Sequence, residues 1–120
     1  MNKNRTIQTR IQFIKGIDEN VLPIVYLTRS RDGSTGTATF KFKKAAILER
    51  TAENDGEITG MYLIDEEGIL ETRVVNIRFK KGKPKLIEAI YIMQSLKDWV
   101  RFFRFMERYN KRNALEFIKY

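Results

Sequence analysis

The fold is decided by the stretch Asp32-Gly33-Ser34-Thr35-Gly36-Thr37-Ala38-Thr39-Phe40-Lys41-Phe42. Its first two residues form the dipeptide that best tolerates positive φ, which predicts a tight turn. From Thr35 onward, polar residues alternate with Phe40 and Phe42, as in a strand that presents one apolar face. A second run of strand-forming residues, 25–29, precedes the turn. Together the two runs predict a β-hairpin.

Similar alternating runs lie on both sides of this hairpin. Glycines separate them, which is typical of consecutive strands joined by turns. The predicted strands cover residues 8–15, 57–65 and 71–79. Residues 86–93 form either a sixth strand or the entry to the next element, and residues 44–50 are predicted to form one or two helical turns.

The apolar period changes near the C-terminus. Trp99, Phe102, Phe103 and Met106 follow the i, i+3, i+4, i+7 spacing of an amphipathic helix. Ser95, with Asp98 three residues later, predicts a capped start, and the helix is expected to end at Asn110 or Asn113. The pattern predicts an α+β fold, in which an antiparallel β-sheet meander packs against a long C-terminal α-helix.

The length fits a single domain over residues 1–120. Its ordered core is expected at about residues 8–110, between a basic N-terminal tail and a polar C-terminal tail. The first ten residues carry no apolar signal core, so we expect no cleaved presequence. No apolar run approaches the roughly 18 residues that a membrane-spanning helix needs.

The composition limits the possible chemistry. The 120 residues include no Cys and no His, which excludes thiol and imidazole catalysis and the usual zinc ligands. Asp65, Glu66 and Glu67 are adjacent, but they fall in a predicted turn that we expect to be solvated. We therefore predict that the protein is not an enzyme and has no cofactor or metal.

Positive charge dominates, with 23 Lys and Arg against 15 Asp and Glu and a net charge of +8. The charge is segregated, because residues 73–85 hold six bases and no acid while residues 49–71 hold eight acids and one base. Such a dipolar molecule would orient on a charged surface.

Two kinds of partner fit these residues. The positive charge and the strand aromatics Phe40, Phe42, Tyr62 and Phe79 suggest a small RNA-binding β-sheet module, although the glycine of the RNA-recognition signature is missing. A protein partner is the favoured alternative.

The residues 33–36 either cradle an anion through backbone N–H groups or form an ordinary hairpin turn.

The aromatic helix stripe is expected to lie in the core. It is wide, however, and Phe105 lies on the far side of the helix from Phe103. We therefore expect Phe105 to be exposed between arginines, which is the composition of a protein-interface anchor.

Four stretches together resemble one family. They are residues 27–40, residues 57–68, residues 79–91 and Trp99-Val100-Arg101-Phe102-Phe103-Arg104-Phe105-Met106-Glu107-Arg108-Tyr109. The chain is similar over residues 11–109 to the photosystem II reaction-centre W protein family, also called the subunit-twenty-eight assembly proteins. Ile24, Tyr26, Val100 and Phe103 depart from the usual residues of that family.

The resemblance implies an accessory protein and no catalytic activity. Members of the family bind transiently to photosystem II assembly intermediates, against the inner antenna protein and the reaction-centre subunits. They lie peripherally on the cytoplasmic or stromal face of the thylakoid, over the quinone-acceptor side. A tail of the inner antenna protein extends their sheet. The resemblance thus implies membrane association through protein, no nucleic acid partner and a monomer when bound.

Two surfaces are the candidates for partner binding. The first is the polar face of the predicted hairpin, with Arg29, Arg31, Ser34, Thr35, Thr37 and Thr39. The second is the basic face of the C-terminal helix, with Arg101, Arg104, Phe105 and Arg108. A solvated turn and a solvated helix face remain the alternatives for the two sets.

Overall fold

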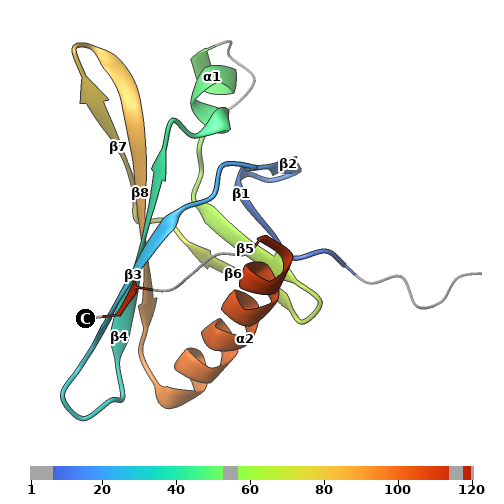
Figure 1. Cartoon of the computed structure of the whole chain (residues 1–120), viewed down its shortest axis with the longest axis vertical. Helices are drawn as coiled ribbons and strands as arrows, with labels where there is room; N and C mark the ends of the chain where they lie inside the picture. Colours follow the sequence, from blue (N-terminus) through green and yellow to red (C-terminus); the bar gives the residue numbers. More distant parts are fainter. Residues whose placement is uncertain (1–6, 53–56, 114–117, 120) are drawn as a thin grey trace, which may run out of the picture.

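Two β-sheets and a long helix make up the computed structural model, which describes residues 7–52, 57–113 and 118–119 (Figure 1). The first sheet has the strand order β2-β1-β5-β6. Its strands are β1 (Arg10–Ile14), β2 (Ile17–Asp18), β5 (Met61–Asp65) and β6 (Gly68–Thr72), and all of its pairings are antiparallel.

The second sheet is the larger one and has the strand order β7-β8-β4-β3-β9. It contains β3 (Ile24–Arg29), β4 (Gly36–Lys43), β7 (Val75–Lys80), β8 (Lys83–Met93) and the short β9 (Ile118–Lys119). The predicted hairpin is confirmed, because β3 pairs antiparallel with β4 from Ile24 opposite Lys41 to Arg29 opposite Gly36. Among the described strands, β9 is the one that pairs in the parallel sense, with Tyr26 and Leu27 of β3.

The predicted α+β class is confirmed, but the prediction of one continuous strand over residues 71–79 is wrong. The run is divided between β6 in the first sheet and β7 in the second. At the break, the Thr72 hydroxyl donates to the Ile90 carbonyl at 2.7 Å and accepts from the Val74 amide at 3.1 Å. These side-chain bonds replace the ladder and turn the chain from one sheet into the other.

Helix α2 (Leu96–Asn113) lies against both sheets, and the short α1 (Ala46–Ala52) follows β4 (Figure 1). The start of α2 is capped as predicted, since the Ser95 hydroxyl accepts from the Asp98 amide at 3.1 Å. The Asp98 carboxylate accepts in turn from the Gln94 amide at 3.0 Å. Within the described residues, no helix is long and apolar enough to cross a membrane.

The core lies between α2 and the inner faces of the sheets. Phe102 packs on the second sheet, where its ring centroid lies 6.1 Å from that of Phe40 and 5.4 Å from that of Tyr91. Along β4, Ala38, Phe40 and Phe42 are buried, whereas the alternate residues are partly exposed. The outer face of the second sheet is therefore a polar surface, which positions the first candidate site.

Candidate partner-binding surfaces

The turn between β3 and β4 is held by a network of its own side chains. The Asp32 carboxylate accepts from the Ser30 hydroxyl at 2.8 Å, the Ser34 amide at 3.0 Å and the Ser34 hydroxyl at 2.7 Å. The hydrogen bonds from Ser34, followed by the one from Ser30, lower the pKa of Asp32 to about 2. The Ser30 hydroxyl also accepts from the Thr35 amide at 3.0 Å.

These bonds decide between the two interpretations of the residues 33–36. The amides of Gly33, Ser34 and Thr35 all bond to acceptors inside the turn. An anion would have to break these bonds to be cradled there, so the segment is an ordinary hairpin turn with a fixed shape. Ser34 and Thr35 are exposed at its tip.

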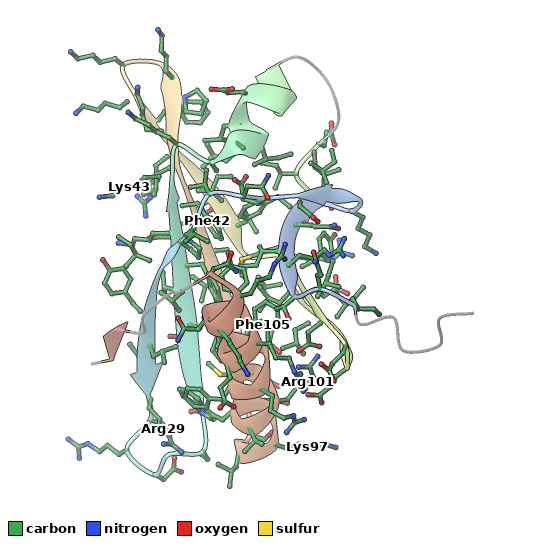
Figure 2. All side chains as sticks on the ribbon, turned by 45° about the vertical axis from the view of Figure 1, so that its right-hand side comes forward. Arg29, Phe42, Lys43, Lys97, Arg101 and Phe105 are labelled. Atoms are coloured by element: carbon green, nitrogen blue, oxygen red, sulfur yellow. The ribbon has the colours of Figure 1, made fainter. Side chains whose placement is uncertain are left out.

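The two arginines of this hairpin have different environments. Arg29 lies over the Trp99 ring, with its guanidinium carbon 5.1 Å from the ring centroid, and its Nε donates to the Gly33 carbonyl at 3.1 Å. Arg29 thus braces the turn against the start of α2 (Figure 2). Arg31 is exposed at the turn, where its charge is available to a partner.

Thr37 and Thr39 lie on the outer face of the second sheet. The Thr37 and Thr28 hydroxyls share a hydrogen bond of 2.5 Å across β3 and β4. Thr39 lines a shallow hollow of about 320 Å³ together with Tyr26, Lys41 and Glu88. In this hollow the Lys41 ammonium lies 5.1 Å from the Tyr26 ring centroid and 3.7 Å from the Glu88 carboxylate. The structure thus brings five of the six hairpin residues to the turn or the outer face, and Arg29 to a supporting position.

The arginines of α2 bind carboxylates of the turn between β5 and β6. Arg101 makes two hydrogen bonds to Asp65, of 2.9 and 2.7 Å. Arg104 makes two to Glu67, of 2.7 and 2.8 Å. Arg108 bridges the two carboxylates, because its Nη1 donates to Asp65 at 2.8 Å and to Glu67 at 2.6 Å. We call these five residues the arginine–carboxylate network.

The network lowers the pKa values of its carboxylates. Burial raises the pKa of Asp65, but hydrogen bonds from Arg101, Arg108 and the Glu67 amide outweigh burial and leave that pKa below its ordinary value of 3.8. Hydrogen bonds from Arg104 and Arg108 lower the pKa of Glu67 to about 2. Both side chains are therefore ionised at neutral pH, and they neutralise much of the helix charge.

The expectation that Asp65, Glu66 and Glu67 form a solvated turn is wrong for Asp65. Its side chain is buried, and the residue as a whole is 1% exposed. Glu66 and Glu67 are both exposed residues, as expected. The Glu66 side chain is 56% exposed and lies 3.6 Å from Arg108, whereas the Glu67 side chain is 29% exposed and is held by Arg104. The helix arginines are accordingly not a free cationic face, because a partner carboxylate would compete with ion pairs within the chain.

The expectation that Phe105 is exposed is also wrong. Phe105 is 0% exposed and stacks on Tyr109, with 5.7 Å between the ring centroids. Helix α2 lies against two sheets rather than one, so a wider arc of its surface is buried. Phe105 belongs to the core and cannot anchor a partner.

The aromatic residues that suggested an RNA-binding sheet are mostly in the core as well. Phe40, Phe42 and Tyr62 are buried, so they present no face on which a base could stack. Phe79 is the exception, at 65% exposed, and it lies beside lysines at the turn between β7 and β8. Sequence reasoning missed this surface, although the basic run 80–85 directly after an alternating strand was its signal.

In the described part of the chain, no three Asp or Glu side chains are grouped so that they could hold a metal ion. The features above define a class of protein: a small basic α+β protein with two sheets joined through one helix and exposed charged surfaces. The chain belongs to the Psb28 protein family, whose model matches residues 11–117. The family resemblance predicted from the sequence is therefore confirmed.

Curated relatives support this assignment over most of the chain. The chain is 66% identical over 113 residues to the "Photosystem II reaction center Psb28 protein" of Phaeodactylum tricornutum. The aligned residues cover 94% of this chain and 98% of that protein. It is 66% identical over 110 residues to the protein of the same name in Thalassiosira pseudonana, covering 92% of this chain and 96% of that protein. It is 51% identical over 113 residues to the "Photosystem II reaction center PSB28 protein, chloroplastic" of Arabidopsis thaliana, covering 94% of this chain and 61% of that protein.

Proposed function

We propose that this chain is a photosystem II accessory protein, acting by binding and without catalysis. The observation that carries the proposal is the 66% identity to a relative named as a photosystem II reaction center protein, over 98% of that relative. We propose further that the chain binds assembly intermediates transiently, on the cytoplasmic or stromal face of the thylakoid. Its partners there are the inner antenna protein and the reaction-centre subunits near the quinone-acceptor side.

The outer face and turn of the β3–β4 hairpin are the proposed contact surface. Arg31, Ser34 and Thr35 are exposed at the turn, and Thr37 and Thr39 continue the polar surface along β4. The network around Asp32 fixes the turn before binding, so little ordering cost remains for this surface. Arg29 supports the turn through Trp99 and is proposed to position Arg31 rather than to contact the partner.

The edge of β3 is the proposed site for an added strand. β-Augmentation uses the unpaired backbone groups of an edge strand for affinity and neighbouring side chains for register. β3 pairs with β4 along its full length on one side; on the other, the described residues of β9 pair with Tyr26 and Leu27. This edge therefore already accepts a short strand, and it adjoins the proposed contact surface.

The proposed mechanism is steric and conformational. Bound as a monomer, the protein holds acceptor-side loops in an immature arrangement and limits premature electron transfer until later subunits displace it. The arginine–carboxylate network serves this role by joining α2 to the first sheet, because a rigid body transmits the geometry of its contact surface.

Affinity capture from thylakoids tests the proposal. We expect the tagged full chain to enrich photosystem II intermediates that contain the inner antenna protein. The Arg31→Glu variant should reduce this capture at least about tenfold. Lys15→Glu is the matched control, since it makes the same charge change at an exposed residue in the turn between β1 and β2 of the other sheet.

Two outcomes would contradict the proposal. Enrichment of ribosomes or RNA without photosystem II subunits would favour the RNA-binding alternative, and its binding should then fall steeply with salt through counterion release. Equal capture by Arg31→Glu and the wild type would remove the hairpin from the interface while leaving photosystem II as the partner.

A further inference from the structure

The β7–β8 hairpin extends beyond the rest of its sheet. The pairing of β4 with β8 ends at Lys43 opposite Leu86, whereas β7 and β8 continue to Lys80 opposite Lys83. Residues 79–84 are thus supported by two strands only, and the tip projects from the body of the molecule (Figure 1). A projecting tip meets a partner before the rest of the sheet does.

An aromatic side chain points outward at this tip. Val75 and Ile77 pack against the core, and continued alternation would bring Phe79 to the same side. That side is no longer covered at the tip, because Phe79 lies beyond the end of the β4–β8 pairing, and Phe79 is 65% exposed. The register shift between Arg78 and Phe79 comes from one extra residue on β8, Lys85, which places a further lysine at the tip.

Six lysines surround the tip. Together with Leu86 they line a hollow of about 650 Å³, and they are Lys43, Lys44, Lys80, Lys81, Lys83 and Lys85. Among the described residues, no carboxylate lines the hollow. Within the part of the chain that the structure describes, none of the six ammonium groups lies in a salt bridge. Nitrogen-tipped side chains radiate from the tip in Figure 2.

The type of cation points to the partner. The carboxylates that are held by two hydrogen bonds from one side chain are held by arginine, as in the paired bonds from Arg101 to Asp65 and from Arg104 to Glu67. The hairpin tip uses lysine alone, whose ammonium is a point charge on a flexible stem. Lysine stems can lie along an apolar surface while their ammonium groups reach anionic headgroups.

We propose that the tip of the β7–β8 hairpin binds the surface of an anionic lipid bilayer directly. Phe79 enters the boundary between headgroups and acyl chains, and the six lysines contact the surrounding headgroups. Exposed aromatic residues combined with lysines are the composition by which peripheral segments lie at a membrane interface. This contact is with lipid itself, and it is independent of the proposed binding to photosystem II.

Vesicle sedimentation with the full chain tests the proposal. We expect the chain to bind vesicles of phosphatidylcholine with about 30% phosphatidylglycerol and to leave neutral phosphatidylcholine vesicles unbound, consistent with headgroup electrostatics. The triple variant Lys80→Gln, Lys81→Gln and Lys83→Gln should weaken binding roughly 100-fold. Phe79→Ser should weaken it about tenfold, because the apolar anchor is lost while all charges remain.

The matched control removes the same charge elsewhere. Lys15→Gln, Lys97→Gln and Lys111→Gln lie on the other sheet and on α2, and we expect binding within about twofold of wild type. Figure 2 shows Lys97 well away from Lys43 at the hairpin end of the sheet. Equal loss in the two triple variants would mean that net charge alone drives binding, and it would overturn the proposal.

A label at the tip gives a second readout. Since the chain has no Cys, Lys83→Cys provides a single attachment site for an environment-sensitive fluorophore. We expect a blue shift on addition of the anionic vesicles, and no shift for the same fluorophore at Lys97→Cys. No shift at residue 83 would overturn the proposal. Tighter binding of poly-glutamate than of the vesicles would also overturn it, and would assign this surface to an acidic protein segment.

Discussion

Arg101 holds the buried carboxylate of Asp65 with two hydrogen bonds, although the two residues lie 36 positions apart in the chain. The pair joins the end of β5 to α2, and Arg108 adds a third bond to the same carboxylate at 2.8 Å. A buried ion that loses its partner costs much more than a surface ion pair contributes. The stability of the connection between the first sheet and α2 therefore depends on Asp65.

Asp65→Asn should lower the free energy of unfolding by about 3 kcal/mol, because the two arginines lose their buried charge partner. Urea denaturation followed by circular dichroism measures the change. Glu66→Gln is the control one residue away, and we expect it to change stability by less than about 0.5 kcal/mol since Glu66 is largely exposed. Equal effects of the two substitutions would contradict the assignment of Asp65 as the buried member.

Acid should destabilise the protein between pH about 5 and about 2. The pKa values of Asp65 and Glu67 are lower in the folded protein than their ordinary values of 3.8 and 4.5. The unfolded chain therefore binds more protons in this range, and the free energy of unfolding falls as pH falls. Glu67→Gln should flatten the slope, because it removes one of the two carboxylates whose pKa is lowered. An unaltered slope in Glu67→Gln would show that other carboxylates dominate.

Phe105→Ala should cost about 3–5 kcal/mol, because it leaves a cavity where α2 contacts the core. Phe79→Ala is the matched substitution at an exposed phenylalanine, and we expect an effect within about 0.5 kcal/mol. Thermal unfolding of both variants at one pH measures the difference. A small effect at Phe105 would restore the interpretation of that residue as a surface anchor.

Glu19→Ala should loosen α1. The Glu19 carboxylate accepts from the Ala46 amide at 3.0 Å and from the Ile47 amide at 2.9 Å, and so caps the helix from a distant part of the chain. Loss of a cap typically costs about 1–2 kcal/mol. Hydrogen exchange at the two amides should accelerate, while Asn20→Ala, at the exposed neighbour, should leave their exchange unchanged.

Gly36→Ala should be more damaging than Gly82→Ala. A Cβ at Gly36 would lie 2.2 Å from Cζ2 of Trp99 and 2.3 Å from the Thr28 carbonyl oxygen, so the start of β4 would have to move. Overpacking of this kind costs about 1–3 kcal/mol or more. A Cβ at Gly82 would meet no atom within 4 Å, but the φ of this residue is +77°. The cost of Gly82→Ala is therefore conformational and about 1 kcal/mol. Comparable losses in the two variants would contradict the close packing of Trp99 on Gly36.

Patterns between residues close in the sequence predicted the elements whose formation depends on those same residues. The turn dipeptide and the alternation around Phe40 fix the β3–β4 hairpin, and the spacing from Trp99 to Met106 fixes α2. Phe105 could not be placed in the same way, because its burial depends on a second sheet that the helix pattern does not encode.

Long-range pairings also account for the errors at the candidate sites. The run after Glu71 alternates like one strand, and its division depends on a bond from Thr72 to a carbonyl 18 residues later. Asp65 resembles an ordinary turn residue until Arg101 and Arg108 of α2 are placed beside it. Charge patterns along the chain indicate which residues are polar, but they do not indicate which of them are already paired.

The position of α2 also determines when the protein can fold during synthesis. Both sheets, apart from the short β9, are built from strands that precede Leu96, yet Phe40 and Tyr91 are covered by Phe102 of α2. A nascent chain that has reached Met93 can pair these strands but leaves their inner aromatic faces exposed to water. Because domains emerge from the ribosome N-terminus first, the native core closes only after α2 has left the exit tunnel. Until then the exposed inner faces of the sheets are open to association with other chains.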